Sequence, residues 1–447
     1  MRKKVVEGSV LFASILKWLF LASCIGIIVG MSTTVFLKLL GFAISGASQY
    51  HYYYILLPAA LFLSALLVKV FAPDAQGHGT EKIIEAVHRQ SGKIKLAVVP
   101  VKLAATIITI AVGGSAGKEG PAAQIGAALS SGFADLMRFN DRDRKKLVIC
   151  GISAGFATVF GTPIAGALFG VEVLFVGTML YDVLLPSFVA GIVGYQVSST
   201  LGITYFHGPL HFIPTFSSFF FLKICLAGLF FGLCSLLLIE VLNLFERLSH
   251  MIRVFVPAKG LIGGSALIFL SWLFSTRYLG LGLDTIKDSL EGGSVPGSAF
   301  FLKILFTAIT LSFGGSGGII TPIFFVGATA GHAFGTLLGF DVTIFSAIGI
   351  VALLAGAANT PISASIMAIE LFGPEVAPYA AVACIVSFLM TGHRSVYPSQ
   401  VLSLSKSSSL LVSQGSEMRD AGQVDFQPQP KSVSARLLKY LTGKRWR

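Results

Sequence analysis

Charged side chains are scarce in this 447-residue chain. They make up 12% of the residues, about half the share of a soluble domain, while hydrophobic residues reach 54%. A chain of this composition cannot hide its apolar surface from water, which excludes an ordinary soluble protein. Long apolar stretches, several near the roughly 20 residues that cross a bilayer as a helix, predict an all-α polytopic membrane protein. They cover residues 10–30, 55–71, 97–112, 183–203, 218–242, 260–276 and 343–358.

Paired cysteines and enzyme motifs are also lacking. The cysteines are scattered through apolar segments without paired spacing, which predicts packing thiols and excludes a disulfide framework or metal site. No HExxH, Walker loop or nucleophile motif is present, so we expect no enzyme, no catalytic residue and no cofactor. A membrane-embedded enzyme using Glu119, His78 and Glu81 is the weakest alternative. The five cysteines are Cys24, Cys150, Cys225, Cys234 and Cys384.

The net charge of +12 comes mainly from basic residues at the two ends and in short loops. This placement favours a membrane protein surrounded by lipid over one that binds nucleic acid. By the positive-inside rule both termini are cytoplasmic, which requires an even number of crossings of the cell membrane. The first apolar run lacks a cleavage site, so we interpret it as a retained helix. The terminal basic residues are Arg2, Lys3, Lys4, Lys439, Lys444, Arg445 and Arg447.

Two pairs of segments repeat along the chain. Residues 113–127 (GGSAGKEGPAAQIGA) match residues 314–328 (GGSGGIITPIFFVGA), 201 positions later. A second pair shares Thr-Pro-Ile and a glutamate ten residues after that threonine, Glu172 and Glu370, 198 positions apart. We therefore predict two homologous halves, roughly 10–205 and 215–400, with a substrate site at their interface. Their relative orientation cannot be read from the motifs.

The composition changes near residue 403, where Ser, Gln and Lys become common. We predict a membrane core over residues 1–402 and a basic, mobile cytoplasmic tail over 403–447. Two alternatives remain open for the end of this tail: a short amphipathic helix at 433–442 resting on anionic lipid, or a disordered end.

The glycine-rich segment 113–120 ends at Pro121, a residue suited to the first turn of a helix. Backbone N–H groups and the positive end of a helix dipole can there hold an anion without a fixed cation, which allows release. Segment 314–322 offers a second such nest. Glu119, the one acidic residue in the first nest, is a functional candidate because it lies within a membrane segment. Its carboxylate can imitate the anion when ionised and leave when protonated; the alternative is simple stabilisation of the helix start.

These residues resemble the CLC family of chloride channels and proton-coupled chloride exchangers. GKEGP at 117–121 is similar to the family's GREGP, GGIITP at 317–322 to its GxFxP segment, and Tyr397 in GHRSVYPS to its anion-coordinating tyrosine. The resemblance covers about residues 70–405. It implies an inverted repeat of two helical halves with short, broken and tilted helices, without C-terminal CBS domains as in the bacterial type, and a homodimer with one pathway per subunit.

The resemblance also assigns roles to residues. Glu119 is implied as the gating and proton-coupled glutamate, and the Tyr397 hydroxyl as a donor to the central anion. From base rates alone, Tyr397 would be a tyrosine of the membrane boundary. The implied anion-binding set is Gly77, His78, Gly79, Gly117, Lys118, Gly120, Gly318, Ile319, Ile320, Thr321 and Tyr397.

Three departures from the family pattern bear on mechanism. GHGTE at 77–81 replaces GSGIP, so that His78 stands at the serine and Glu81 at the proline. The His78 ring either donates N–H to the anion or only packs at a helix start. Val173 stands where proton-coupled members carry an internal glutamate, and passive channels often have valine there. We expect the neighbouring Glu172 to be structural, paired with a helix end or a basic group.

The third departure is Ile320-Thr321, where phenylalanine-alanine is commoner. This pair resembles the fluoride-exporting branch, whereas Pro121 and the absence of that branch's first motif favour chloride. We predict transport of small anions, chloride first, by proton-coupled exchange gated by Glu119. The alternatives are a passive voltage- or pH-gated chloride channel and a fluoride/proton antiporter. The partners are then chloride or fluoride and protons, with the halide as transported ion.

Overall fold

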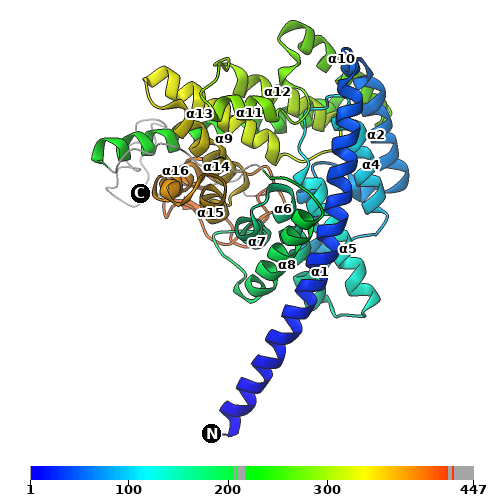
Figure 1. Cartoon of the computed structure of the whole chain (residues 1–447), viewed down its shortest axis with the longest axis vertical. Coiled ribbons are helices and arrows are strands. Elements are labelled where there is room, and N and C mark those ends of the chain that lie inside the picture. Colours follow the sequence, from blue (N-terminus) through cyan, green and yellow to red (C-terminus); the bar gives the residue numbers. More distant parts are fainter. Residues whose placement is uncertain (1, 206–207, 209–216, 421–424, 427–447) are drawn as a thin grey trace.

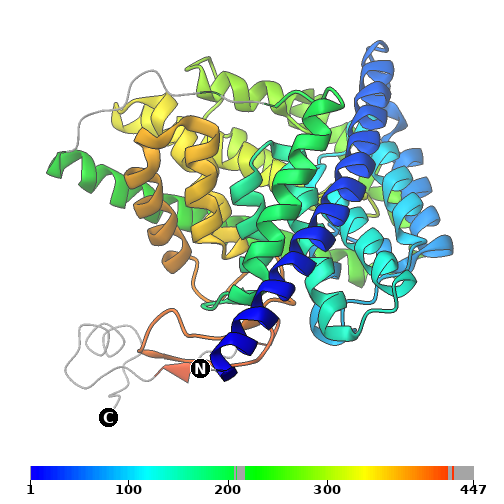
Figure 2. The same cartoon turned by 60° about the horizontal axis from the view of Figure 1, so that its bottom comes forward.

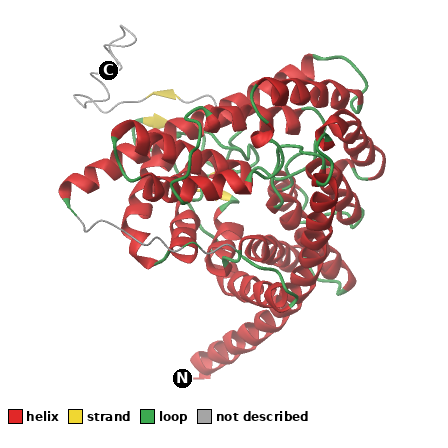
Figure 3. Ribbon diagram, turned by 45° about the horizontal axis from the view of Figure 1, so that its top comes forward, coloured by secondary structure: helices red, strands yellow, loops and turns green. Residues whose placement is uncertain are grey.

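Helices dominate the computed structural model, which describes residues 2–205, 208, 217–420 and 425–426 (Figures 1 and 3). The first half holds α1 (Arg2–Ser48), α2 (Leu57–Phe71), α3 (Thr80–Arg89), α4 (Val98–Ala111), α5 (Glu119–Leu136), α6 (Asp141–Phe160), α7 (Pro163–Glu172) and α8 (Tyr181–Thr200). The second half holds α9 (Ser218–Met251), α10 (Ala258–Leu273), α11 (Leu283–Leu290), α12 (Ala299–Ser312), α13 (Ile320–Leu338), α14 (Val342–Ala358), α15 (Pro361–Phe372) and α16 (Ala377–Met390).

Short elements connect these helices. Single 3-10 turns lie at Tyr53–Leu56, Pro73–Ala75, Thr276–Tyr278 and Pro374–Val376. Two-residue strands form two small ladders: β1 (Phe175–Val176) pairs in parallel with β2 (Val401–Leu402), and β3 (Leu410–Leu411) pairs antiparallel with β4 (Asp425–Phe426).

Proline and glycine divide the apolar segments into short helices. Pro163 and Pro361 open α7 and α15 at the first helical position, where an N–H group is not needed. Gly161 and Gly339 end α6 and α13 in the left-handed conformation, with φ of 72° and 65°. The helix order repeats between the halves, so the predicted inverted-repeat fold of short and broken helices is confirmed.

Several helical stretches are long and apolar enough to cross a membrane. α1 is 47 residues long and extends beyond the rest of the helices (Figure 1). Large apolar side chains such as Phe42 and Trp272 are about four-fifths exposed, which suits a lipid surrounding. The prediction of a multi-pass membrane protein is confirmed. Five stretches among the described residues qualify: Lys3–Ser48, Tyr53–Phe71, Tyr181–Thr200, Ser218–Met251 and Ile320–Leu338.

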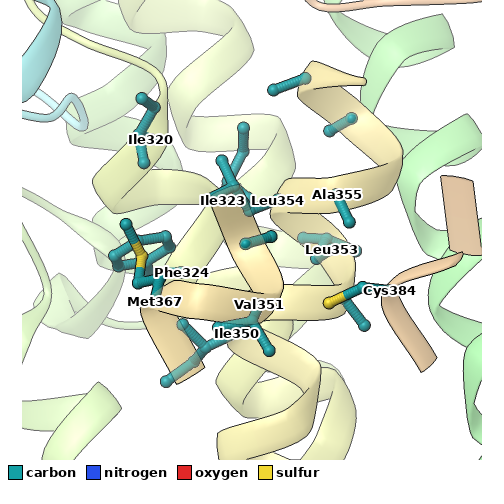
Figure 4. Close-up of a cluster of buried hydrophobic side chains, with 14 of the residues drawn as sticks. Ile320, Ile323, Phe324, Ile350, Val351, Leu353, Leu354, Ala355, Met367 and Cys384 are labelled. Atoms are coloured by element: carbon teal, nitrogen blue, oxygen red, sulfur yellow. The ribbon is translucent and has the colours of Figure 1, made fainter. Parts of the chain in front are cut away.

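The main apolar core is formed largely by the second half. Ile323, Leu353 and Met367 are fully buried where α13, α14 and α15 meet (Figure 4). Gly327 of α13 lies against the Gly349 carbonyl of α14 so closely that a Cβ atom would not fit. Small residues allow such backbone approach between membrane helices, and the close packing gives the site a rigid support.

Two glutamates join the halves by capping each other's helices. The Glu172 carboxylate at the end of α7 accepts the N–H groups of Ile362 and Ser363 at 3.0 and 2.8 Å, at the start of α15. The Glu370 carboxylate of α15 accepts those of Ile164 and Ala165 at 2.9 and 2.8 Å, at the start of α7. Each negative charge thus meets the positive end of the opposite helix, and the expected structural role of Glu172 is confirmed.

Residues 401–420, the C-terminal strap, follow the loop after α16 and run along the outside of the helices (Figure 2). The strap adds β2 to β1, and Lys406 Nζ donates to Asn359 Oδ1 at 2.6 Å and to the Phe388 carbonyl at 2.7 Å. Residues 403–420, which we expected in a mobile tail, are therefore hydrogen-bonded to the core. The expected helix at 433–442 lies outside the described residues.

Replacing Glu172 with alanine should lower stability, because the N–H groups of Ile362 and Ser363 at the start of α15 lose a charged acceptor. We expect the free energy of unfolding in mild detergent to fall by about 2 kcal/mol. Denaturant titration followed by helical circular dichroism measures this change. Glu375→Ala, which removes an exposed carboxylate in the 3-10 turn after α15, is the control. Equal stability of the two variants would contradict the role of the reciprocal caps.

Candidate anion-binding site

The two glycine-rich segments meet at the centre of the protein. Gly117 and Gly318 exchange backbone hydrogen bonds of 2.7 and 2.6 Å in an antiparallel bridge. Around this bridge, the Ser115 N–H donates to Thr310 Oγ1 and the Ser316 N–H donates to Thr109 Oγ1, each at 3.0 Å. Every one of these bonds joins the first half to the second, so neither glycine-rich segment is complete without the other half.

The Glu119 carboxylate occupies the space between the two nests. Glu119 is fully buried at the start of α5, and neither carboxylate oxygen makes a hydrogen bond of normal geometry. The backbone N–H groups of Lys118, Glu119 and Thr321 lie near it. A Cβ atom on Gly318 would lie 2.7 Å from Glu119 Oε2, and one on Gly117 would lie closer still. Glycine at both positions therefore leaves room for a negatively charged group at the starts of α5 and α13.

His78 and Tyr397 form a second part of the site. Their ring centroids are 5.5 Å apart. Tyr397 is fully buried, which excludes an exposed position at the membrane boundary. Its hydroxyl has Thr80 as a polar neighbour but makes no hydrogen bond of normal geometry, and His78 Nδ1 also has no partner. Both rings thus present a free polar atom within the protein.

The loop that carries His78 is held by a buried lysine. Lys102 Nζ, in α4, donates to the carbonyls of Gly77 at 2.6 Å and Ala75 at 3.0 Å. Lys303, 201 positions later, makes the equivalent bonds to Gly280 at 2.8 Å and Tyr278 at 3.1 Å. Sequence reasoning missed both lysines, although a cation within an apolar run that recurs at the repeat distance was a usable signal.

Several buried polar atoms without partners gather from both halves. Buried polar groups are normally hydrogen-bonded, so a group of unpaired ones indicates a ligand. Gln124 was not predicted from sequence; its Nε2 donates to the Asp74 carbonyl at 2.8 Å and its Oε1 is unpaired. The buried atoms are both Glu119 carboxylate oxygens, His78 Nδ1, Thr321 Oγ1, Tyr397 Oη and Gln124 Oε1.

The predicted anion set is distributed around these atoms. Gly120 packs so closely on the His78 carbonyl that a Cβ atom would not fit. Gly79, with φ of 89°, approaches the Gly120 carbonyl. Ile319 and Ile320 are buried and contribute backbone at the start of α13. Both halves thus supply the site.

A cavity of about 540 Å³ opens beside His78. Its lining includes Gly77, His78 and Glu81, the segment Gly314–Ser316 and Arg419. The cavity is large enough for several hydrated ions. It brings open space to His78, one of the predicted anion-binding residues.

Val173 is buried at the end of α7, and its carbonyl accepts Gln400 Nε2 at 2.8 Å. The Glu172 carboxylate next to it is used by the α15 cap. Neither residue provides a free carboxylate here. Among the described residues, no cluster of three or more His, Cys, Asp or Glu side chains is arranged to hold a metal ion.

Comparison with known proteins identifies a consistent group. The family model described as "Voltage gated chloride channel" matches residues 60–392. A "Chloride/fluoride channel protein" of Pseudomonas syringae pv. tomato is 35% identical over 429 residues, covering 94% of each chain. A "Voltage-gated ClC-type chloride channel ClcB" of Escherichia coli is 29% identical over 338 residues, covering 72% of this chain and 79% of the relative.

Solved structures show the same likeness. A CLC-type fluoride/proton antiporter is similar with a TM-score of 0.83 and 28% identity, covering 87% of this chain and 98% of the other. A slow cyanobacterial Cl⁻/H⁺ antiporter is similar with a TM-score of 0.73 and 20% identity, covering 84% and 94%. The second likeness, at this identity, concerns the fold alone.

Replacing Gly318 with alanine should weaken halide binding, because the added methyl group occupies the space beside the Glu119 carboxylate. We expect affinity for chloride or fluoride to fall about tenfold or more, as for an overpacked site. Isothermal titration of the purified protein measures it. Gly297→Ala is the matched control, because no atom lies within 4 Å of its added Cβ. Unchanged binding in Gly318→Ala would place the anion elsewhere.

Proposed function

The chain belongs to the voltage-gated chloride channel (CLC) family. On that basis we propose that it exchanges small halide anions, chloride first, for protons across the membrane, with Glu119 as the gate. One observation carries the proposal: a fully buried carboxylate lies between two helix starts without a normal hydrogen bond. A permanent structural carboxylate would use its acceptors, as Glu172 does.

In the proposed exchange, the Glu119 carboxylate and a halide compete for the same position at the starts of α5 and α13. When ionised, the Glu119 carboxylate is attracted to the backbone N–H groups at the starts of α5 and α13. When protonated, it loses this attraction, and a halide can take the same position. A proton on Glu119 and a halide in the nest therefore occur together, which links the movement of one ion to the other. No fixed cation holds the halide there, so it can also leave.

His78 and Tyr397 are proposed to hold the halide on the cavity side of Glu119. The Tyr397 hydroxyl donates O–H, and the His78 ring donates N–H in place of the serine of the family pattern. Lys102 positions the His78 loop through its hydrogen bond to the Gly77 carbonyl. This arrangement offers a halide donors from both halves of the repeat.

Val173 cannot carry a proton, so a proton on its way to Glu119 must take another route. With valine at that position, we propose that protons reach Glu119 through water in the 540 Å³ cavity beside His78. A protein without such a route would be a passive anion channel in which Glu119 only gates. Recording halide and proton flux together separates a proton-coupled exchanger from a passive channel.

Fluoride is the second candidate substrate. Thr321 Oγ1 is buried without a hydrogen-bond partner, and the backbone of the same residue lies near the Glu119 carboxylate. A free hydroxyl suits a small anion that accepts strong hydrogen bonds. The Pseudomonas relative and the structure at 28% identity both carry fluoride in their descriptions. Chloride and fluoride must therefore be measured together.

We also propose the assembly and orientation that the family and the charge pattern suggest. Two copies form a homodimer with one pathway in each subunit, embedded in lipid. Both termini face the cytoplasm, because basic residues flank the first span and end the chain.

Glu119→Gln should abolish proton coupling while leaving anion movement, because glutamine has neither a titratable group nor a negative charge. In liposomes, a halide gradient should drive protons uphill through the wild type and not through the variant. Halide and proton movement are recorded in the same vesicles with ion-selective electrodes. Glu291→Gln, an exposed substitution in the second half, should behave as the wild type. Proton transport that persists in Glu119→Gln would contradict the proposed role of Glu119 as the gate. Halide flux without proton movement in the wild type would identify a passive channel.

Thr321→Val should lower fluoride transport relative to chloride, because the lost hydroxyl is a donor to the smaller ion. We expect the fluoride to chloride rate ratio to fall about fivefold to tenfold, which corresponds to the net worth of one typical hydrogen bond. The ratio is measured by efflux from matched vesicles. Thr329→Val on the same helix is the control, because its hydroxyl donates to the Phe325 carbonyl at 2.8 Å. An unchanged ratio would remove Thr321 from substrate selection.

A further inference from the structure

An unusual acid lines the cavity beside His78. Glu81, in the first turn of α3, accepts hydrogen bonds from the Ser399 N–H at 3.0 Å and the Ser399 hydroxyl at 2.5 Å. Its side chain is 14% exposed and lines the same cavity as His78. A negative charge here faces the path that an incoming anion must take.

The countercharge comes from the C-terminal strap. Arg419 Nη2 lies 3.7 Å from Glu81 Oε1, and the arginine lines the same cavity. In the described part of the chain, no other Lys or Arg lies within ion-pair distance of this carboxylate. The strap therefore neutralises a charge that belongs to the membrane core.

The strap holds Arg419 in a defined place. The Arg419 N–H donates to the Pro398 carbonyl at 2.9 Å, and the Met418 N–H donates to the Gln400 carbonyl at 2.8 Å. Two residues before Arg419, the Glu417 carboxylate receives two hydrogen bonds of 2.7 Å from the Arg89 guanidinium at the end of α3. Strap and α3 are thus joined at both ends of the helix.

The other charged side chains that line the cavity have contacts of their own. Lys82 pairs with Glu85 at 2.8 Å. Lys259 Nζ donates to the Ser249 carbonyl at 2.5 Å, and Lys69 lies 4.2 Å from the centre of the Phe255 ring. The remaining charged or titratable lining residues are Glu246 and His250, which face one another on α9 at 3.8 Å.

From these contacts we propose that Arg419 controls anion entry from the cavity by neutralising Glu81. This inference rests on the proposed anion transport and adds a residue outside the membrane core to the pathway. Without Arg419, the unpaired Glu81 carboxylate repels a halide on its way to His78. A negative charge without a countercharge in a cavity lowers the local anion concentration and the rate of anion entry.

The test is halide transport by wild type, Arg419→Gln, Glu81→Gln and the double variant in planar bilayers, with halide varied on one side at a time. We expect Arg419→Gln to raise the apparent KM on the cavity side about threefold to tenfold at low ionic strength. The KM on the opposite side and the maximal rate stay unchanged. Arg419→Lys and the double variant should restore the wild-type KM, and added inert salt should reduce the difference.

A cysteine variant tests the charge at position 419 within one protein sample, so a difference in folding between variants cannot cause the result. Arg419→Cys is measured before and after a membrane-impermeant methanethiosulfonate reagent on the cavity side, so each protein serves as its own reference. A cationic reagent should restore transport and an anionic one should not. The treated wild type controls for the native cysteines. Arg142→Gln, which removes one positive charge from the first turn of α6 outside the cavity, is the charge control and should match the wild type.

The outcomes are distinct. An active wild type with an unchanged Arg419→Gln variant overturns the inference and leaves the transport function intact. A loss that is equal on both sides, or that Glu81→Gln does not rescue, also overturns it, because it indicates a structural role of the strap. Absence of halide transport in the wild type removes the proposed function, and the inference falls with it.

Discussion

A buried carboxylate between two helix starts is the constraint on which this structure depends. In a low-dielectric interior, a negative charge is costly unless N–H groups and positive dipole ends surround it. The starts of α5 and α13 supply both, and glycines at 117 and 318 leave the space that the Glu119 carboxylate fills. Because one helix comes from each half, the charge can be accommodated only when the two halves meet.

The contacts between the halves also pair polar groups of one half with polar groups of the other. Ser115 and Ser316 donate their N–H groups to threonine hydroxyls of the opposite half, and Glu172 and Glu370 cap each other's helices. The bonds come in related pairs, so the repeat satisfies buried polar groups across the interface between the halves. Polar atoms of Glu119, His78 and Tyr397 are among the buried atoms left unpaired, and these three residues are the ones that the proposal assigns to an exchanging ion.

The position of the site could be read from the chain because its determinants are local. The repeat at 201 positions, the glycines before Pro121 and an acid within an apolar segment are visible without coordinates. Lys102 and Gln124 were overlooked, since a single polar residue in an apolar run does not reveal which carbonyls it will meet. The partner of Glu81 was equally hidden, because Arg419 lies 338 positions away, in a segment whose polar composition resembles a mobile tail.

The sequence by itself determined the membrane setting, the helical repeat, the two anion nests and the candidate gate at Glu119. These features depend on composition, on proline and glycine placement and on neighbours within a few residues. Only the tertiary structure decided that the two glycine-rich segments meet, that Tyr397 is buried beside His78, and that the strap brings Arg419 to Glu81. Those contacts join segments up to hundreds of residues apart. They stabilise the fold because buried charged and polar groups gain partners, and no local sequence pattern shows which groups will pair.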